Sequence, residues 1–404
     1  MITPILDEKL VKETLERGIE RIYPSTSSLE NALQSGKSLH FYYGIDPTSP
    51  HLHLGHAIPL FVLRRLQKLG HEITILIGDF TAMIGDPTEK SQTRVQLSEN
   101  EVKENLKTYK KQLAKVIDFS GPNPARIKFN SKWLKKLSLS DVIRLAANPT
   151  VQQMIQRDMF QARIKHELPI GLHEFLYPLL QGYDSVALNT DGEVGGNDQT
   201  FNMLVGRDLL KTYRQKEKFV ISAKLLVNPK TGKKMSTTEG EVINLADEPE
   251  ITFGKIMAQE DGLILPLAEL ATELPIERVR AIETEIKSGK NPRDAKMEIA
   301  GAIVELLHSK EAAKRAKREF VKVFKEKKAP SAMKEIKPAT NPITLLDLIM
   351  QSGFATSKSI AKRLVEQGAV RLNGEKKTNI EELISIAEKT VLQVGPRNFV
   401  KILI

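Results

Sequence analysis

Two histidines and a glycine lie at the start of a predicted helix. His53, Gly55 and His56 follow a turn at residues 46–50, and an amphipathic run begins at Gly55. Imidazole nitrogens can contact phosphate or ribose oxygens, glycine lets a ligand approach the backbone, and a helix N-terminus favours anions. The spacing therefore indicates a nucleotide site. Histidines in an ordinary surface loop would show the same pattern, so this motif alone leaves both interpretations open.

A second group of polar residues shares one face of a predicted helix. Tyr177, Gln181 and Asp184 are spaced i, i+4, i+7, so their side chains point the same way. A phenol, an amide and a carboxylate that converge would form the polar wall of a pocket. Pro178 either starts this helix or kinks it. A solvated polar stripe is the alternative.

Two glycine-containing loops could complete such a site. Gly195, Gly196 and Asp198 precede a helix predicted at residues 201–210. Glycines allow a ligand to come close, and the Asp198 carboxylate can accept from ribose hydroxyls, although a capped turn has the same composition. Lys234 lies in a later, basic loop. An ammonium group there can follow the charge that develops on a transferring phosphate, although lysines are common in surface loops.

Alternating strands and helices would position these residues. The run at residues 39–45 predicts a buried strand, the amphipathic run that Gly70 closes predicts a helix, and residues 73–77 predict a second strand. This βαβ unit implies a parallel sheet. A helix is also predicted at 1–21, and another from the Ser98/Glu101 capping box to about residue 117. Two further strands are predicted at 126–129 and 219–222, with helices between these strands to about residue 212. The pattern predicts a Rossmann-like, doubly wound α/β catalytic domain over residues 1–225.

The rest of the chain is predicted to form three parts. The basic loop and a helical domain occupy residues 226–328, a proline-containing linker occupies 329–342, and a small α+β domain occupies 343–404. In this last domain we predict helices at 344–351 and 356–366 and strands at 369–372 and 391–404. Its basic residues would suit the backbone of structured RNA; they are Lys358, Lys362, Arg363 and Arg371.

The composition limits the classes of function. The 404 residues suffice for two or three domains, and the absence of cysteine excludes disulfides and thiolate metal sites. No apolar run approaches the ~20 residues that span a bilayer, and the N-terminus lacks the apolar segment of a signal peptide, so we expect a cytoplasmic protein without a membrane partner. The net charge of +10 either favours a polyanionic partner, nucleic acid before membrane, or serves solubility.

The order of the motifs resembles one family closely. His53-x-Gly55-His56 and Lys234-Met235-Ser236 are similar to the two signatures of class I aminoacyl-tRNA synthetases, and essentially the whole chain resembles the bacterial tyrosyl-tRNA synthetases of that class. The other matching motifs are Tyr42-x-Gly44-x-Asp46-Pro47-Thr48, Gly85-Asp86-Pro87, Tyr177-Pro178-Leu179-Leu180-Gln181-Gly182-Tyr183-Asp184 and Gly195-Gly196-x-Asp198-Gln199. Each motif is modest alone, but six in register are specific.

The resemblance implies an activity and its partners. The protein would activate L-tyrosine with ATP and transfer it to tRNA(Tyr). ATP would act as a substrate with Mg²⁺, and we expect no tightly bound cofactor and no protein metal site. The family also implies a homodimer.

The resemblance also implies roles for individual residues. Tyrosine would be held by Tyr42 and Asp184 at its hydroxyl, by Asp86, Tyr177 and Gln181 at its ammonium group and by Gln199 near its carboxylate, with Asp46 in the same site. ATP would be held by Thr48 and His53 at its phosphates and by His56, Gly196 and Asp198 at its ribose, with Gly44 and Gly55 beside them. The departing pyrophosphate would be stabilised by Lys234, Lys90 and Arg94.

Two positions depart from the family pattern. Thr237 stands where the second signature often has a lysine, and Lys233 is the residue that would compensate. Tyr43 occupies a position beside the ATP site that is commonly small.

Three other functions fit the sequence less well. A tryptophanyl enzyme would lack the C-terminal domain and the Tyr42/Asp184 pair. An RNA-binding protein that has the synthetase fold but no longer the synthetase activity would have lost catalytic residues that are present here. A Rossmann-type dehydrogenase would need a Gly-x-Gly-x-x-Gly motif after the first strand, which this chain lacks.

Overall fold

The structure is a computed structural model of the 404-residue chain, in which two compact units are found. It describes residues 3–88, 96–229, 232, 242–324, 333–387, 390–395 and 398–404. The first unit is Met1–Ala313 and the second is Lys314–Ile404. In the part of the chain that the structure describes, no helix has both the length and the apolar composition needed to cross a membrane.

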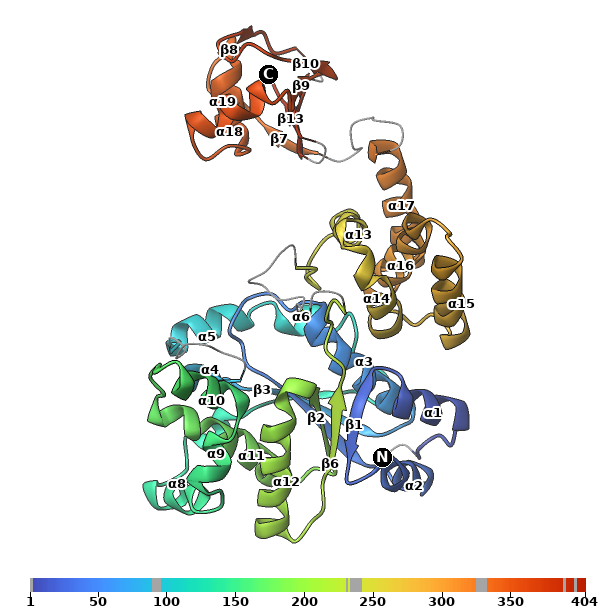
Figure 1. Cartoon of the computed structure of the whole chain (residues 1–404), viewed down its shortest axis with the longest axis vertical. Coiled ribbons are helices and arrows are strands. Elements are labelled where there is room, and N and C mark those ends of the chain that lie inside the picture. The colour runs from blue at the N-terminus through green and yellow to red at the C-terminus, as the bar shows by residue number, and fades with distance from the viewer. Residues whose placement is uncertain are drawn as a thin grey trace. The chain divides into compact units, whose positions relative to one another are not determined.

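A six-stranded sheet forms the centre of the first unit (Figure 1). Its strands, in spatial order, are β1 (Ile19–Tyr23), β6 (Phe219–Ala223), β5 (Gly192–Gly196), β2 (His40–Ile45), β3 (Glu72–Ile77) and β4 (Arg126–Phe129). Five strands, from β6 to β4, are parallel, and β1 pairs antiparallel with β6 at one edge. The predicted doubly wound α/β fold is confirmed, and the four predicted strands are β2, β3, β4 and β6.

The connections between strands create a crevice at the middle of the sheet. Helix α3 (Leu54–Lys68) joins β2 to β3, and α12 (Thr200–Arg214) joins β5 to β6. These connections run in opposite directions from the centre, so right-handed crossovers place α3 and α12 on opposite faces. Helix α11 (Tyr177–Leu188) packs along α12. The strand order reverses between β2 and β5, and ligands bind α/β sheets at the carboxyl ends of such strands.

Other helices surround this sheet and follow it in the chain. Those around the sheet are α1 (Glu8–Glu16), α2 (Thr26–Gln34), α4 (Thr81–Ile84), α5 (Glu99–Leu106), α6 (Tyr109–Leu113), α7 (Ser131–Leu134), α8 (Leu139–Ala146), α9 (Val151–Ile155), α10 (Asp158–Lys165), η1 (Leu172–Phe175) and η2 (Asn197–Gln199). The following stretch is helical, as predicted: α13 (Pro249–Ala258), η3 (Asp261–Leu263), α14 (Ile264–Leu270), α15 (Ile276–Lys287), α16 (Pro292–Leu307) and α17 (Lys310–Phe324), the last of which crosses into the second unit.

The second unit contains two sheets and a pair of helices. The larger sheet has the order β10 (Glu375–Lys376), β9 (Val370–Leu372), β12 (Thr390–Val394), β13 (Asn398–Ile402) and β7 (Lys334–Ile336), and the smaller pairs β11 (Leu383–Ile384) with β8 (Ile343–Thr344). Helices α18 (Leu345–Ser352) and α19 (Lys358–Glu366) begin at N-caps Thr344 and Ser357. Leu345, Leu348 and Leu392 form part of its own core. The two predicted helices and the strand predicted at 369–372 are confirmed, but the single strand predicted at 391–404 is two strands, β12 and β13, which pair antiparallel.

Four further local predictions, in addition to the strand at 391–404, were wrong in detail. The helix predicted at 1–21 ends at Glu16, because residues 19–23 extend the sheet edge as β1. The predicted run of helices before residue 212 is interrupted by β5 at the centre of the sheet. The predicted linker contains β7, which pairs with β13.

The fourth difference concerns the helix that starts at Ser98. The capping box is present, but the helix divides into α5 and α6. Around the break, Asn105 Nδ2 donates to the carbonyl of Pro47 at 2.8 Å and Tyr109 Oη donates to that of Ser49 at 2.6 Å. The divided helix therefore supports the turn that leads to His53.

Gly192 tests the packing at the sheet centre. A Cβ atom on Gly192 would lie 2.5 Å from the Phe41 ring, and Phe41 is fully buried. Gly192→Ala is expected to lower the free energy of unfolding by about 1–3 kcal/mol, measured by urea denaturation. The control is Gly301→Ala in α16, where no described atom lies within 4 Å of the added carbon. The control should raise stability by up to about 1 kcal/mol; equal effects of the two changes would contradict this packing.

Candidate active site

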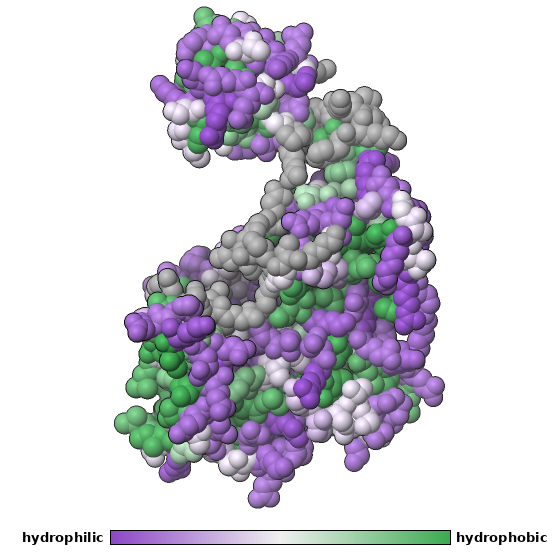
Figure 2. Space-filling model, in the orientation of Figure 1, coloured by the Kyte–Doolittle hydropathy of each residue, from purple (hydrophilic) through white to green (hydrophobic). Residues whose placement is uncertain are grey.

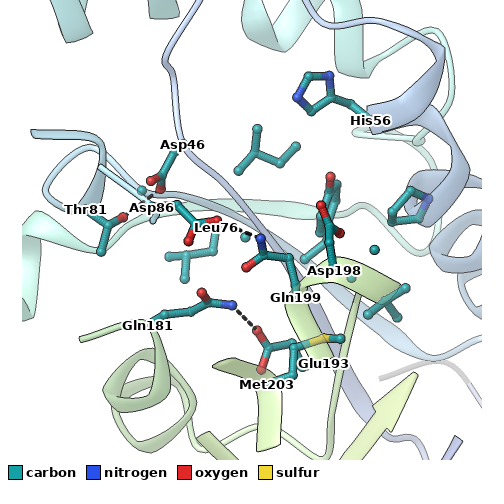
Figure 3. A pocket seen from close by; sticks show the side chains of 18 of the residues that line it. Asp46, His56, Leu76, Thr81, Asp86, Gln181, Glu193, Asp198, Gln199 and Met203 are labelled. Atoms are coloured by element: carbon teal, nitrogen blue, oxygen red, sulfur yellow. Dashed lines mark hydrogen bonds between the residues drawn. The ribbon is translucent and has the colours of Figure 1, made fainter. Parts of the chain in front are cut away.

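A cavity of about 310 Å³ lies at the carboxyl ends of β2, β3 and β5 (Figure 3). The structure brings most of the predicted residues to its wall: Gly44, Asp46, Thr48, His53, Gly55, His56, Asp86, Tyr177, Gln181, Asp184, Gly196, Asp198 and Gln199. The polar groups that the sequence placed on separate loops and helices therefore converge on one pocket, whose volume suits a small-molecule ligand.

The two histidines of the first motif form a cap on α3. The backbone N–H of Gly55 donates to Nδ1 of His53 at 3.1 Å, and the N–H of His53 donates to Nδ1 of His56 at 3.3 Å. Burial lowers the pKa of His53 to about 4 and that of His56 to about 3. Near pH 7 both rings are therefore neutral, and because each Nδ1 accepts, each carries its proton on Nε2. Each Nε2–H is left as a donor.

Gly55 is required by this arrangement. A Cβ atom at this position would lie 2.9 Å from Cε1 and 3.0 Å from Nδ1 of His53. Because Gly55 has no side chain, the His53 ring can lie against the start of α3.

Asp46 anchors Tyr177 at one side of the pocket. Tyr177 Oη donates to one carboxylate oxygen of Asp46 at 2.8 Å, and Thr81 Oγ1 donates to the other at 2.7 Å. Gly78 leaves the space for this carboxylate, since a Cβ atom there would lie 1.9 Å from Asp46 Oδ1. The Tyr177 side chain, which belongs to α11, is therefore held by the residue that follows β2.

Asp184 is a buried carboxylate with two fixed donors. Trp133 Nε1 donates to Oδ1 at 2.7 Å and Asn130 Nδ2 donates to Oδ2 at 3.2 Å. The Asn130 amide is itself oriented, because its oxygen accepts from the N–H of Phe80 at 3.0 Å. Burial raises the pKa of Asp184 well above its usual range, and the charges of Glu193 and Asp46 add to the rise. This group can accept a hydrogen bond from a ligand hydroxyl.

A chain of amides links the middle of the pocket. Asn202 Nδ2 donates to Gln181 Oε1 at 2.9 Å and to Gln199 Oε1 at 3.0 Å. Gln199 Nε2 in turn donates to Asp86 Oδ2 at 2.7 Å, and the Thr88 hydroxyl donates to Asp86 Oδ1 at 2.7 Å. Asp86 and Gln181 therefore present fixed oxygens, which suit a cationic group.

Tyr42 and Tyr43 lie on β2 but differ in their relation to the pocket. Tyr43 lines it, and burial, followed by the charge of Asp198, raises the pKa of its hydroxyl. Tyr42 is fully buried and is not among the lining residues. Its Oη lies 2.7 Å from Ser185 Oγ. In this structure the Tyr42 hydroxyl thus lies behind the pocket wall.

Four residues of the site were not found from the sequence. They are Asn130, Trp133, Glu193 and Lys218. Asn130 and Trp133 follow β4, and their spacing carries no motif. Glu193 and Lys218 are far apart in sequence and meet only because β5 and β6 are neighbours.

The basic loop lies outside the described residues. This applies to Lys233, Lys234 and Thr237, and also to Lys90 and Arg94. The described segments on either side of the basic loop reach the site: Leu226 lines the pocket, and the N–H of Leu54 donates to the carbonyl of Ile243 at 3.0 Å.

The four basic residues of the second unit that were predicted to bind RNA are exposed. Lys358, Lys362 and Arg363 lie on α19, with a spacing that puts Lys358 and Lys362 on one side. Arg371 on β9 donates from Nη1 to the carbonyl of Gly374 at 3.0 Å. These charges are available to a polyanion.

Comparisons with known proteins identify the family of this chain. The model of "tRNA synthetases class I (W and Y)" matches residues 34–325, and that of the "Tyrosine--tRNA ligase SYY-like C-terminal domain" matches residues 319–395. The tyrosine–tRNA ligase of Moorella thermoacetica is 44% identical over 392 residues, which cover 96% of this chain and 94% of the relative. That of Carboxydothermus hydrogenoformans is 43% identical and covers 99% of both chains. The chain belongs to the tyrosine–tRNA ligase family.

Solved structures share the fold of this tyrosine–tRNA ligase family member. A mitochondrial tyrosyl-tRNA synthetase from Aspergillus nidulans has a TM-score of 0.66 at 24% identity, covering 78% of this chain and 94% of that one. A tyrosyl-tRNA synthetase from Archaeoglobus fulgidus, complexed with L-tyrosine, has a TM-score of 0.59 at 22% identity, covering 77% and 100%. The predicted family is confirmed, and ATP and tRNA are substrates of such enzymes.

The buried histidines predict how stability depends on pH. Burial lowers the pKa of His40, His53 and His71 to about 4 and of His56 to about 3. The unfolded chain takes up protons near pH 6.5 that the folded chain does not, so the free energy of unfolding should fall as the pH drops from 7 to 5.

Urea denaturation across this range tests the expectation. The double variant His53→Gln/His56→Gln should show a shallower fall than the unchanged protein, whereas His51→Gln, at an exposed position, serves as the control. An identical fall in the double variant would contradict the burial of these two rings as neutral groups.

Proposed function

We propose that this protein activates L-tyrosine with ATP and transfers the tyrosyl group to tRNA(Tyr), as a tyrosine–tRNA ligase. The observation that carries the proposal is the buried Asp184 carboxylate at the wall of a pocket that the two histidines of the first signature also line. Family membership and the matching of both units support it.

The first step joins the amino acid to AMP. The tyrosine carboxylate attacks the α-phosphorus of ATP, an oxygen–phosphorus bond forms, and the bond to pyrophosphate breaks. In the second step a ribose hydroxyl at the tRNA 3′ end attacks the carbonyl carbon and AMP leaves. The first step needs no enzyme nucleophile, so positioning and charge stabilisation supply most of the acceleration.

The arrangement of polar groups supports one orientation for tyrosine. Asp184, with both oxygens fixed by donors, would accept the phenol proton, and Tyr42 would approach the same hydroxyl. The oxygens of Asp86 and Gln181 would receive the ammonium group together with Tyr177. A site that hydrogen-bonds a substrate hydroxyl rejects the analogue that lacks it, an effect for which this enzyme family is a standard example.

The neutral histidines would bind ATP through hydrogen bonds rather than charge. The Nε2–H groups of His53 and His56 are the free donors of the pair, and phosphate and ribose oxygens are suitable acceptors. Thr48, Gly196 and Asp198 line the same pocket. Lys234, Lys90 and Arg94 would supply the positive charge for pyrophosphate.

We also propose that ATP enters as its Mg²⁺ complex. Magnesium is usually held by substrate phosphates, water and one or two carboxylates. The described residues include no group of three or more histidine, aspartate or glutamate side chains that could hold a metal ion. Phosphate oxygens would then be its main ligands.

An exposed apolar surface supports the proposal of a homodimer. Large hydrophobic residues are exposed on elements of the first unit that lie close together in the sequence. These residues are Leu139 and Ile143 on α8, Val151 on α9, and Leu172 on η1. Figure 2 shows hydrophobic surface over α8 and α10. Large apolar patches mark interaction sites. A monomer in sedimentation equilibrium would contradict the dimer.

We place the enzyme in the cytoplasm, with its tRNA substrate.

Pyrophosphate exchange tests the proposed activity. With each of the twenty amino acids in the absence of tRNA, tyrosine alone should support ATP–pyrophosphate exchange. Asp184→Asn should lower the ratio of kcat/KM for tyrosine to that for phenylalanine by about 10- to 100-fold, since one of the two acceptor oxygens becomes an NH₂ group that faces a donor, Trp133 or Asn130, and the acceptor for the substrate hydroxyl is disturbed. Asp208→Asn, an exposed change on α12, is the matched control. If the folded protein supported exchange with none of the amino acids, an RNA-binding protein with the synthetase fold would be favoured instead.

The basic residues of α19 predict a separate defect. The triple variant Lys358→Ala/Lys362→Ala/Arg363→Ala should raise the KM for tRNA and flatten its salt dependence, because phosphate contacts are lost, but leave exchange unchanged. Aminoacylation at several salt concentrations measures both. Lys9→Ala/Lys12→Ala/Lys37→Ala removes the same charge from exposed positions of the first unit. Equal effects of the two triple variants would contradict a specific RNA surface.

A further inference from the structure

A buried ion pair lies behind the pocket and has no part in the mechanism above. Lys218 precedes β6, Glu193 lies on β5, and the two are 1% and 2% exposed. The Lys218 ammonium donates to Glu193 Oε2. Glu193 lines the pocket. Buried ion pairs add little stability relative to apolar residues, so this one invites a functional explanation.

One branch of hydrogen bonds leads from Lys218 to Tyr42. Lys218 Nζ donates to Ser185 Oγ at 2.8 Å, and Ser185 Oγ lies 2.7 Å from Tyr42 Oη. An ammonium group only donates, so the serine oxygen accepts from it. Ser185 is fully buried, and its own proton needs an acceptor; among the hydrogen bonds of the described residues, Tyr42 Oη provides one. The phenolic proton of Tyr42 is then left to donate to another acceptor, and in this structure the Glu193 carboxylate is one.

The second branch leads from Lys218 to Gln181. A carboxylate only accepts, so the Glu193 side chain fixes which end of the Gln181 amide faces it. Gln181 Nε2 donates to Glu193 Oε1 at 3.3 Å (Figure 3). The amide oxygen therefore lies on the other side, where it accepts from Asn202. The oxygen of Gln181, rather than its NH₂ group, is left for a cation in the pocket.

We infer that Lys218 is a positioning residue for tyrosine recognition. By donating to both Ser185 and Glu193, its ammonium group sets the direction of the hydrogen bonds in two side chains that would bind the substrate. Tyr42 is made a donor, toward Glu193 in this structure and toward the substrate hydroxyl when tyrosine is bound. The substrate hydroxyl donates its own proton to Asp184, and Gln181 is made an acceptor for the substrate ammonium group. The inference rests on the proposed function, because it assumes that tyrosine occupies the pocket.

The packing around Lys218 keeps its ammonium group in this place. Helices α11 and α12 approach each other at Gly182 and Gly206, where a Cβ atom on Gly206 would lie 3.2 Å from the Gly182 Cα. The same Cβ would lie 2.8 Å from both Lys218 Nζ and Ser185 Oγ. Burial lowers the pKa of Lys218, and the charge of Glu193 opposes this change. The Lys218 ammonium group is thus held in one position by the two helices and paired with Glu193, so it can act as a donor of fixed direction.

Two variants test the inference by exchange kinetics with tyrosine and phenylalanine. Ser185→Ala cuts the branch to Tyr42 and retains the ion pair, so folding should persist. Lys218→Met/Glu193→Gln removes both charges together and leaves no unpaired buried ion. In each we expect the tyrosine-to-phenylalanine ratio of kcat/KM to fall about 10-fold or more, from the loss of an oriented buried hydrogen bond.

The control and the other readouts separate positioning from stability. Lys216→Met makes the same change two residues away, in a partly exposed pair with Asp191 at 2.8 Å, and should keep the ratio. The KM for ATP should not change in any variant, and the midpoint of thermal unfolding reports stability separately. A purely structural role would shift the midpoint and leave the ratio unchanged.

The outcomes distinguish this inference from the proposed function. If the unchanged protein exchanges pyrophosphate with tyrosine and either folded variant keeps the full ratio, the positioning role of Lys218 is overturned and the function stands. Should the double variant not fold, Ser185→Ala decides alone. If the unchanged protein shows no tyrosine-dependent exchange, the proposed function fails, and the inference fails with it.

Discussion

Carboxylates buried beside a pocket must each be met by donors from the surrounding structure, because an unpaired buried charge is costly. Asp184 accepts hydrogen bonds from Trp133 and Asn130, which follow β4. Asp46, which is only partly buried, accepts a hydrogen bond from Tyr177 of α11, and the buried Glu193 accepts one from Lys218. Each donor comes from a different element than its carboxylate. The position of the strands therefore determines whether the pocket can exist, and the pocket in turn fixes the acceptors that a ligand meets.

The sheet makes these pairings possible at the point where its strand order reverses. β2 and β5 are neighbours there, and both carry glycines. Gly192 accommodates the Phe41 ring, while Gly196 leaves room for the Asp198 carboxylate, which a Cβ atom would approach to 2.4 Å. The N-terminus of α3 and the end of β5 line the same cavity. A nucleotide site and an amino-acid site can then share one cavity, which adenylate formation requires.

Local patterns in the sequence predicted the parts of this arrangement that depend on near neighbours. The strand before His53, the start of α3 at the histidine motif and the shared face of Tyr177, Gln181 and Asp184 follow from spacing alone. β5 was missed because Gly-Glu-Val-Gly-Gly has neither an apolar run nor alternation, and its strand conformation depends on β2 and β6. The partners Trp133 and Lys218 were missed for the same reason, since the fold alone brings them to Asp184 and Glu193. The resemblance to a family supplied the residue roles, which spacing could not.

The most direct measurement is an experimental structure of the protein with bound L-tyrosine. The account predicts that the phenol oxygen lies within hydrogen-bond distance of the Asp184 carboxylate and the Tyr42 hydroxyl, with the ammonium group near the oxygens of Asp86 and Gln181. Tyrosine bound in the reverse direction, with its ammonium group at Asp184, would contradict the account. So would tyrosine bound outside the cavity between β2 and β5.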